Sequence, residues 1–430
     1  MSDSITLSKA GCLKGELKSP PDKSISHRAV FISSLAEGVS VVKNFLYAED
    51  PKATVGAFRN LGVEITERKD ELIITGKGSN ALKEPSDVID CMNSGTTMRL
   101  LLGVLSGCRF SSVLTGDSSL RKRPMARVTV PLRRMNAQFI GREDGRYAPI
   151  AVKGGGLKAI DYTMPIPSAQ VKSSVLLAGL NAEGITSVTE SAKSRDHTER
   201  MLKTFGANIT VNGLSVTIDG TNTLTAAEIT VPGDISSAAF FLAGAAIVAG
   251  SEIVVKGVGL NKTRTGFIDA LIAMGVQVEI NEDKQLQDEP QGDICVKYTD
   301  GLRAFTLDAP DIPALIDEFP ILCVLGLCAH GVTEIRGAEE LRVKESDRIT
   351  AMAGELRKMG AVIEEYPDGV AMEGPQELYG AVVESHGDHR IAMALSIAAL
   401  VAKGQTTING ISSVEISYPG FFEQLRRLTV

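Results

Sequence analysis

SSAAFFLAGAAIVAGSEIVV, residues 236–255, has the composition of a helix that is buried on every side. Small and apolar residues fill the stretch up to Gly250 without a charged side chain, and an alternating segment typical of a strand follows. Helices that are apolar all round belong to protein cores or to membranes. This one is shorter than the about 20 residues that span a bilayer. The stretch therefore predicts a helix packed among sheets, followed by a strand.

The same pattern of helix, glycine and strand occurs six times along the chain. The copies span residues 26–42, 94–113, 173–188, 236–255, 318–335 and 388–408. Their closing glycines are Gly38, Gly107, Gly184, Gly250, Gly331 and Gly404, which stand 69, 77, 66, 81 and 73 residues apart. The repeat is longer than those of common solenoids, so it predicts six larger α/β units.

A second helix end follows each of the first five glycines. It reads FRNLGVEI, LRRMNAQFI, LKTFGANI, LIAMGVQV and LRKMGAVI in chain order. Four copies place a Gly where a helix end needs a left-handed residue, and Asn136 takes that place in the second. The sixth unit ends in a helical FFEQLRRL. Each unit is therefore expected to hold two helices interleaved with short strands.

The six units divide three and three. The segments LKSPPDKSIS (17–26) and ITVPGDISSA (229–238) resemble each other, and proline-bearing crossings of this kind suit a hinge. We expect one lobe at 21–232 and a discontinuous lobe at 1–20 plus 233–430. A chain of 430 residues is long enough for two cores.

Composition excludes some classes of protein. A net charge of −7 and a pI near 5.5 argue against a nucleic-acid binder that works through a global basic field. No secretory signal is visible at the N-terminus, so a cytoplasmic protein is expected. The six cysteines lack a C-x-x-C pair and are expected to be reduced thiols.

Polar and basic residues collect where the six buried helices should begin. Counting back from the closing glycines gives Lys23, Asn93, Ser168, Ser236, Asp317 and Asp388. Simple helix capping explains each serine or aspartate taken alone. It does not explain the nearby cations Lys23, Arg28, Lys172 and Arg390, which oppose the helix dipole unless an anion lies between them. Several such starts facing one cleft would hold a substrate with several anionic groups.

Further charged segments lie outside the helix starts. GDSSLRKRPM (116–125) contains Arg123 and is either an exposed loop or part of an anion site. ELRVKESDR (340–348) contains Lys344, Glu345 and Arg348 and is either a salt-bridged surface helix or an edge of the site. Arg195, in KSRDHTER, follows the strand and turn of the third unit, as the segment 340–348 follows those of the fifth. HGDHR has two histidines without a third ligand, so no metal site is expected.

Nine ordered motifs resemble the 5-enolpyruvylshikimate-3-phosphate synthase family (3-phosphoshikimate 1-carboxyvinyltransferases). They are DKSISHR, NSGTTMR, TGDSSLRKRPM, PSAQVKS, SRDHTE, IDEFPIL, RVKESDR, DHRIAMA and YPGFFEQL. The resemblance covers essentially the whole chain. It implies two lobes, each an inside-out α/β barrel of three βαβαββ units, with the active site in the cleft between them.

The resemblance also implies the reaction. The enolpyruvyl group of phosphoenolpyruvate would pass to the 5-hydroxyl of shikimate 3-phosphate with release of phosphate, in the shikimate pathway to chorismate and the aromatic amino acids. Neither a metal nor an organic cofactor is implied, and the partners are the two small substrates, without nucleic acid or membrane. A monomer is expected.

Roles follow for the matching positions. Catalysis is assigned to Asp317 as base and to Glu345 and Lys23. Binding of shikimate 3-phosphate is assigned to Lys23, Ser24, Arg28, Ser168, Ala169, Gln170, Arg195, Asp317 and Lys344. Binding of phosphoenolpyruvate is assigned to Lys23, Gly95, Arg123, Gln170, Arg348 and Arg390.

The chain departs from the family pattern at several positions. Ala169 stands where other members have Ser, Pro21 where most have Gly, and Ile416 where some have a Lys that closes over phosphoenolpyruvate. Gly95 leaves room beside phosphoenolpyruvate where some relatives have Ala, which makes inhibition by glyphosate a hypothesis.

Two alternatives stay open. The sister enzyme transfers enolpyruvyl to UDP-N-acetylglucosamine on the same fold, but it uses a cysteine in a loop that has none here; Cys108 lies on the preceding strand. A non-catalytic anion-binding protein on the same repeats is the other, and the presence of both Asp317 and Glu345 counts against it.

Overall fold

The chain forms two compact units in the computed structural model, which describes residues 3–69, 71–283 and 289–430. One unit is continuous, Pro21–Val231, and is called the continuous unit below. The other, the discontinuous unit, combines Met1–Pro20 with Pro232–Val430. Each unit has a hydrophobic core of its own, built from residues of that unit alone.

Three sheets of the continuous unit repeat one strand order. The first is β16 (Glu228–Thr230), β3 (Glu37–Lys43), β5 (Glu71–Lys77) and β4 (Glu64–Glu67). The second is β6 (Ile89–Asp90), β7 (Ser111–Thr115), β9 (Tyr147–Lys153) and β8 (Gln138–Gly141). The third is β11 (Asp161–Thr163), β13 (Ile185–Thr189), β15 (Ser215–Asp219) and β14 (Asn208–Asn212). In each sheet the first two strands are parallel and the remaining neighbours are antiparallel.

The discontinuous unit repeats the order with one shorter sheet. Its sheets are β2 (Lys14–Lys18), β17 (Glu252–Gly259), β19 (Gln291–Lys297) and β18 (Val278–Asp283); β20 (Thr306–Leu307), β21 (Gly331–Ile335), β23 (Gly369–Gly374) and β22 (Glu364–Tyr366); and β24 (Val382–Glu384), β25 (Gln405–Asn409) and β1 (Ser4–Ser8). β1 and β2, from the start of the chain, complete sheets whose other strands come from its second half. A small sheet of β10 (Leu157–Lys158) and β12 (Ala182–Glu183) lies in the continuous unit.

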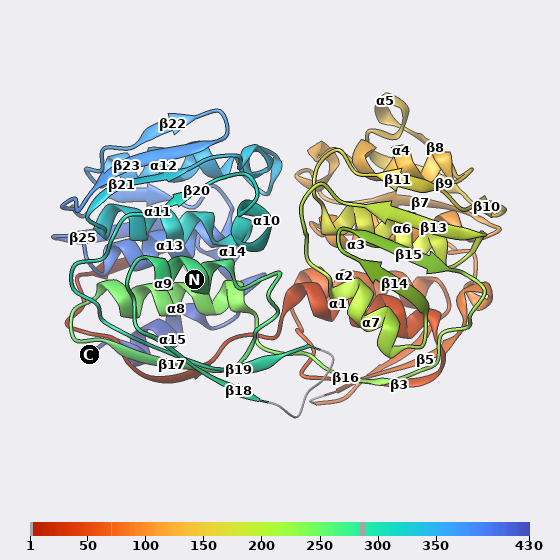
Figure 1. The fold of residues 1–430 in the computed structure, drawn as a ribbon, viewed down its shortest axis with the longest axis horizontal. Helices are drawn as coiled ribbons and strands as arrows, with labels where there is room; N and C mark the ends of the chain where they lie inside the picture. Colours follow the sequence, from red (N-terminus) through yellow and green to blue (C-terminus); the bar gives the residue numbers. More distant parts are fainter. Residues whose placement is uncertain (1–2, 70, 284–288) are drawn as a thin grey trace. The chain divides into compact units, whose positions relative to one another are not determined.

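Six buried helices precede the central strands, as the repeat predicts. They are α1 (Lys23–Leu35), α3 (Gly95–Ser106), α6 (Ala169–Gly179), α8 (Ile235–Ile247), α11 (Phe319–Cys328) and α13 (His389–Ala399). Every helix begins within two residues of the position expected from the glycine spacing. In Figure 1 the strands of each unit are drawn above and below these helices, which makes the fold a mixed α/β fold.

A second set of helices is followed by residues in the left-handed conformation. They are α2 (Glu49–Asn60), α4 (Ala126–Arg134), α7 (His197–Thr204), α9 (Gly266–Ala273) and α12 (Arg348–Lys358), with α15 (Phe421–Leu428) at the C-terminus. Gly62, Asn136, Gly206, Gly275 and Gly360 have φ between 80° and 92°, which confirms the predicted left-handed residue after each of the first five. Short helices α5 (Arg142–Gly145), α10 (Ile312–Leu315) and α14 (Ser412–Glu415) complete the set, with 3-10 turns at Ser79–Ala81, Leu120–Lys122, Ile316–Glu318 and Glu339–Val343.

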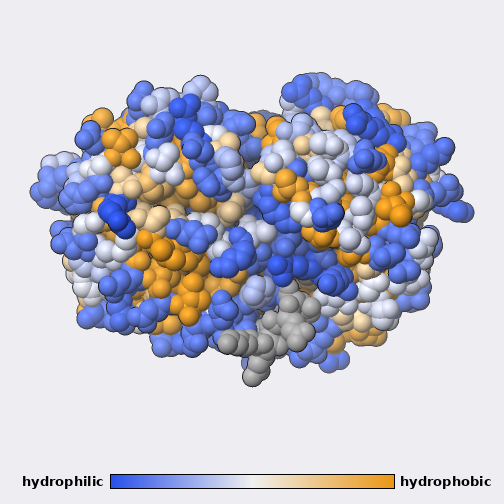
Figure 2. All heavy atoms as spheres, in the orientation of Figure 1, coloured by the Kyte–Doolittle hydropathy of each residue, from blue (hydrophilic) through white to orange (hydrophobic). Residues whose placement is uncertain are grey.

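The apolar helices lie in the two cores, and the face of the molecule drawn in Figure 2 is mainly polar. Figure 2 shows hydrophilic side chains over most of the drawn face, with scattered hydrophobic patches. Within the part of the chain that the structure describes, no helix is both long enough and apolar enough to span a membrane. This agrees with the interpretation of 236–255 as a core helix.

Candidate functional site

Helix α1 places Lys23 and Arg28 at its first turns. Asp22 caps the helix by accepting from the Ile25 N–H at 2.8 Å, which starts the helix at Lys23. The Lys23 Nζ lies 3.1 Å from Asp50 Oδ2 on α2, and 22% of its side chain stays exposed. Lys23 therefore contacts the Asp50 carboxylate while part of its side chain remains exposed.

Arg28 is held by three elements of the continuous unit. It donates from Nε to Thr198 Oγ1 at 2.7 Å, from Nη2 to Ser173 Oγ at 2.9 Å and from Nη1 to the Ser24 carbonyl at 3.0 Å. Its partners lie on α7, α6 and α1. These three contacts are made to neutral oxygens, and together they fix the orientation of the guanidinium.

The start of α3 carries Gly95 beside two arginines. Ser94 caps the helix, and its Oγ accepts from the Thr97 N–H at 3.1 Å. Arg123 donates to Asn93 Oδ1 at 2.7 Å, so the 116–125 segment is tied to this helix start. A Cβ at Gly95 would lie 3.1 Å from Arg99 Nη1 and 3.6 Å from Arg123 Nη1. Both guanidinium groups therefore border the space above Gly95.

Gln170 joins the start of α6 to α3. Ser168 caps α6, accepting from the Val171 N–H at 3.4 Å. Gln170 accepts from Arg99 Nη1 at 2.6 Å and donates from Nε2 to Thr96 Oγ1 at 2.9 Å. Ala169, which lies between Ser168 and Gln170 in the sequence, has only a methyl side chain and offers no hydrogen-bonding group. Arg99, the last residue of NSGTTMR, was not among the predicted site residues although it contacts one of them.

Lys172 does not have the role that the helix-start pattern predicts. Its side chain is fully buried, and Nζ lies 2.8 Å from Glu190 Oε2 and 2.6 Å from Glu199 Oε1. Glu190 also accepts hydrogen bonds from the backbone and hydroxyl of Ser194, the residue before the half-buried Arg195. Lys172 is therefore an internal ion-pair partner that supports the Arg195 loop and is closed to a substrate anion.

The charged residues of the discontinuous unit gather around Arg348. Its guanidinium lies 2.8 Å from Glu345 Oε2, 2.8 Å from Asp388 Oδ2 and 3.3 Å from Asp317 Oδ1. Arg390 Nη2 lies 3.6 Å from Asp317 Oδ2, and its Nη1 donates to the Asp317 carbonyl at 3.2 Å. The structure thus brings Asp317, Glu345, Arg348 and Arg390 together, from the segments IDEFPIL, RVKESDR and DHRIAMA.

Local structure explains how three separate segments reach this cluster. The segment 340–348 is not the continuous surface helix that was one alternative. A 3-10 turn, Glu339–Val343, ends before Lys344, and α12 begins only at Arg348, capped by Asp347. Lys344 and Glu345 therefore lie in the irregular stretch between them. Asp388 caps α13 and also binds Arg348, which aligns the two helix starts.

Electrostatic effects differ among these groups. Burial works against the charge of Arg348, but Asp388, Glu345 and Asp317 together raise its pKa above the ordinary value. Burial likewise disfavours ionised Asp388, yet the Arg348 guanidinium holds the pKa of this carboxyl below its usual range. Burial lowers the pKa of Lys344, with Asp317 acting in the opposite direction. Lys344 therefore loses its proton more easily than an ordinary lysine.

Metal and thiol chemistry have few candidates. Among residues 3–69, 71–283 and 289–430, no group of three or more His, Cys, Asp or Glu is placed to hold a metal ion. All six cysteines are free, and three of them, Cys91, Cys108 and Cys323, are buried. Burial raises the pKa of the Cys108 thiol to about 12, so this thiol is protonated near neutral pH.

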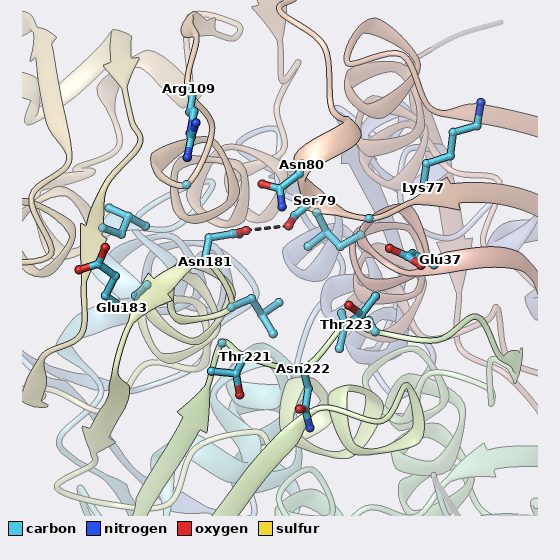
Figure 3. A pocket seen from close by; sticks show the side chains of 18 of the residues that line it. Glu37, Lys77, Ser79, Asn80, Arg109, Asn181, Glu183, Thr221, Asn222 and Thr223 are labelled. Carbon is cyan, nitrogen blue, oxygen red and sulfur yellow. Dashed lines mark hydrogen bonds between the residues drawn. The ribbon is translucent and has the colours of Figure 1, made fainter.

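A cavity of about 420 Å³ lies at the C-terminal ends of α1, α3 and α6, away from the helix starts that carry the candidate site residues. Figure 3 shows Ser79 and Asn181 joined across it by a hydrogen bond of 2.6 Å, with Arg109 extending toward them. Leu35, Gly107 and Leu180, at the C-terminal ends of the three helices, line it. Helix C-termini carry negative partial charge, so this end of the unit is a poorer place for a multiply anionic substrate than the N-terminal end.

The comparisons with known proteins agree with the motifs. Residues 7–425 match the family model described as EPSP synthase (3-phosphoshikimate 1-carboxyvinyltransferase). The chain is 54% identical over 424 residues to a 3-phosphoshikimate 1-carboxyvinyltransferase of Thermodesulfovibrio yellowstonii, covering 98% of this chain and 99% of the relative. It is 52% identical over 421 residues to the one of Bacillus licheniformis, covering 98% of each.

Solved structures extend this similarity to the fold. An EPSP synthase from Acinetobacter baumannii matches with a TM-score of 0.88 at 45% sequence identity, and the match covers 99% of this chain and 98% of that one. A family model over almost the whole chain and relatives at about half identity leave one assignment. The chain belongs to the EPSP synthase (3-phosphoshikimate 1-carboxyvinyltransferase) family.

Proposed function

We propose that this chain is a 3-phosphoshikimate 1-carboxyvinyltransferase of the shikimate pathway. It transfers the enolpyruvyl group of phosphoenolpyruvate to the 5-hydroxyl of shikimate 3-phosphate and releases phosphate. The observation that carries the proposal is the cluster of Asp317, Glu345 and Lys344 around Arg348 and Arg390. Such a cluster combines groups that can move protons with cations that can hold a phosphate or a carboxylate.

The two units divide the binding of the substrates. In the continuous unit Lys23, Arg28, Arg99, Arg123 and Arg195 are cationic. We assign Ser24, Arg28, Ser168, Ala169, Gln170 and Arg195 to shikimate 3-phosphate, with Asp317 and Lys344 from the discontinuous unit. Phosphoenolpyruvate is assigned to Gly95, Arg123, Gln170, Arg348 and Arg390. Lys23 contacts both substrates.

Proton transfer belongs to the two carboxylates. Asp317 accepts the 5-hydroxyl proton as the oxygen attacks C2 of phosphoenolpyruvate, while Glu345 delivers a proton to the methylene carbon. Arg348 fixes both side chains, since it contacts each of them. Phosphate then leaves and takes up the proton held by Asp317, while a methyl proton returns to Glu345, aided by Lys23. The cations stabilise charge that develops on the carboxylate and phosphate oxygens.

The arrangement of the units is part of the proposal. We infer that each forms an inside-out α/β barrel of three units and that the substrates bind in the cleft between the two lobes. The repeated sheet order and the buried helices support the barrels. A monomer in the cytoplasm is proposed with them, since six free cysteines suit a reducing compartment.

The sister reaction on UDP-N-acetylglucosamine is the main alternative function. It would call for a reactive thiol in the 116–125 loop, which contains no cysteine. The nearby Cys108 is buried, with a thiol pKa of about 12. Neither observation favours that chemistry. A non-catalytic anion-binding protein would have no use for both Asp317 and Glu345 beside Arg348.

Phosphate release from phosphoenolpyruvate tests the proposal. The assay is run in EDTA with either shikimate 3-phosphate or UDP-N-acetylglucosamine as acceptor. We expect release with shikimate 3-phosphate alone, a loss in Asp317→Ala, and retention in Asp269→Ala, which changes an exposed aspartate on α9. Release with neither acceptor would instead favour a binding protein, and release with UDP-N-acetylglucosamine would favour the sister enzyme.

A further inference from the structure

A chain of hydrogen bonds runs through the interior of the continuous unit. His27 Nδ1 lies 2.7 Å from Thr54 Oγ1, which lies 2.7 Å from Thr97 Oγ1. Thr97 donates from its hydroxyl to Ser94 Oγ at 2.8 Å. The four residues are between 0% and 1% exposed. They come from α1, α2, α3 and the cap of α3, so the chain crosses three helices that are distant in sequence.

The direction of the chain follows from the number of hydrogens available. Thr97 has one hydroxyl hydrogen, and its Oγ1 lies 2.8 Å from Ser94 Oγ and 3.5 Å from the Asp50 carbonyl oxygen. The shorter contact takes the hydrogen, and either acceptor leaves none for Thr54. In the contact between the two threonines, Thr54 must therefore be the donor. Once Thr54 has given its single hydrogen to Thr97, it can only accept from His27. His27 is then the neutral tautomer that carries its hydrogen on Nδ1 and leaves Nε2 bare.

The Nε2 atom and the protonation state of His27 agree with this order. No hydrogen-bond partner for Nε2 is found in the described part of the chain, as expected for a buried nitrogen that carries no hydrogen to donate. Burial lowers the pKa of His27 to about 3, so the ring stays neutral under physiological conditions. A charged ring would need to donate from both nitrogens.

The chain joins two of the helix starts assigned to substrate. Lys23 and His27 are one turn apart on α1, and their partners Asp50 and Thr54 are one turn apart on α2. The two helices are therefore fastened at two successive turns. Thr54 continues to Thr97 and to the Ser94 cap, which is followed directly by Gly95. The result is a fixed spacing between Lys23 and the Gly95 end of α3.

We infer that Thr54 is a positioning residue for phosphoenolpyruvate, which fixes the start of α3 relative to Lys23 through a one-way hydrogen-bond chain from His27 to Ser94. The inference rests on the proposed function, since Lys23 and Gly95 are assigned there to this substrate. Thr54 itself touches no reacting atom. Its effect is on the distance between two groups that hold the same ligand.

Kinetics of three variants separate this role from simple support of the fold. Thr54→Val keeps the shape of the side chain but removes the hydroxyl, whereas Thr54→Ser keeps the hydroxyl. Thr186→Val is the matched control, since this buried threonine on β13 has no hydrogen-bond partner for its hydroxyl in the described ranges. Each variant is assayed for KM of both substrates, for kcat and for its thermal midpoint.

We expect Thr54→Val to raise the KM for phosphoenolpyruvate by about 10- to 100-fold, with a much smaller change in the KM for shikimate 3-phosphate. Thr54→Ser should have a KM for phosphoenolpyruvate close to that of the wild type, and Thr186→Val should leave this KM unchanged. An equal rise in both KM values, or a fall in thermal midpoint with unchanged KM values, would reduce Thr54 to a structural residue and overturn the inference.

Nitrogen-15 NMR of the histidine rings tests the chain without substrate. The protein has five histidines, and His27→Gln identifies the signals of His27 by their loss. We expect the hydrogen on Nδ1, with no titration between about pH 5 and about pH 8. A hydrogen on Nε2 would contradict the donor order. Because this result needs no activity, it stands apart from a failure of the proposed reaction, which the wild-type phosphate assay detects.

Discussion

Lys23 and Lys172 both lie in the first turn of a buried helix, yet their surroundings differ. Lys23 contacts the Asp50 carboxylate and has a partly exposed side chain. Lys172 contacts two glutamates and is fully buried. The sequence pattern alone makes the two lysines equivalent. Glu190, which directly follows β13, and Glu199 on α7 make Lys172 an internal ion-pair partner, while Lys23 stays a ligand candidate.

Lys172→Ala should strongly destabilise the protein, because it leaves two buried carboxylates without their cation. The expected loss is about 3–5 kcal/mol in the free energy of unfolding. Urea unfolding measures it, with Lys52→Ala on the exposed side of α2 as control. Lys52→Ala should change the free energy of unfolding by no more than about 0.5 kcal/mol. A loss of similar size in both variants would contradict the ion-pair explanation.

His27 should make stability depend on pH. Burial holds its folded-state pKa at about 3, below the ordinary 6.5, while nearby Asp50 raises it and Lys23 lowers it. Between these values the unfolded chain binds a proton that the native state does not. Stability is therefore lost as the pH falls from 6.5 toward 3, by up to about 1.4 kcal/mol per pH unit.

Urea unfolding at about pH 7 and about pH 5 checks this dependence. Carboxylates elsewhere also titrate, so the informative quantity is the difference from His27→Gln. We expect the wild type to lose about 2 kcal/mol more than the variant over this interval. Equal losses in the two proteins would mean that His27 takes up its proton in the native state at the same pH as in the unfolded chain.

Gly95→Ala should impair phosphoenolpyruvate binding. The added Cβ would lie 3.1 Å from Arg99 Nη1, which forces this guanidinium to shift, and 3.6 Å from Arg123 Nη1, which is van der Waals contact and fills the space between the two groups. We expect a rise in KM for phosphoenolpyruvate of about tenfold, with thermal stability little changed. A glyphosate dose-response against phosphoenolpyruvate should show competition in the wild type and weaker inhibition in the variant. An unchanged KM would remove Gly95 from the assigned site.

At the scale of elements, a close contact recurs where a strand passes the end of a buried helix. A Cβ added at any of four glycines would lie within 2.6 Å of a backbone carbonyl oxygen at the end of a helix. The distances are 2.2 Å from Gly76 to Ala36 O, 2.1 Å from Gly154 to Ser106 O, 2.6 Å from Gly220 to Gly179 O and 2.5 Å from Gly374 to Ala329 O. These glycines lie at the ends of β5, β9, β15 and β23 or just beyond. The repeat of the fold therefore includes a contact that only glycine permits.

Gly154→Ala tests this contact. Its Cβ would meet backbone atoms, which cannot rotate away, so we expect a loss of several kcal/mol or failure to fold. Gly354→Ala on α12 is the matched control, since nothing lies within 4 Å of its Cβ position. The free energy of unfolding of that variant, measured by thermal or urea unfolding, should be higher by about 0.5–1 kcal/mol. A Gly154→Ala protein of wild-type stability would contradict the close approach.

At the scale of the whole molecule, the chain passes between the units at Pro20–Pro21 and at Val231–Pro232. Residues assigned to shikimate 3-phosphate belong to both units. If both sets bind the same ligand, adding it should draw them together. We expect the radius of gyration from small-angle X-ray scattering to fall with shikimate 3-phosphate but not with inorganic sulfate. An unchanged radius would count against closure on this substrate.

Much of the repeat was predictable from local sequence. The spacing of the glycines located six helix starts to within two residues, and Asn136 was correctly given a left-handed conformation beside four glycines. Caps and left-handed ends depend on neighbours a few residues away, which a sequence pattern contains. The motifs likewise indicated the family, because each of them is a short run of adjacent residues.

The sequence by itself determined the α/β repeat, the helix starts and the family, since each depends on adjacent residues. Only the tertiary structure decided that β16, β1 and β2 complete sheets formed by distant parts of the chain. It also decided that Lys172 is paired internally and that Thr54 joins His27 to Thr97. These contacts join residues far apart in sequence, and their energy depends on distance, burial and the partner that packing brings close.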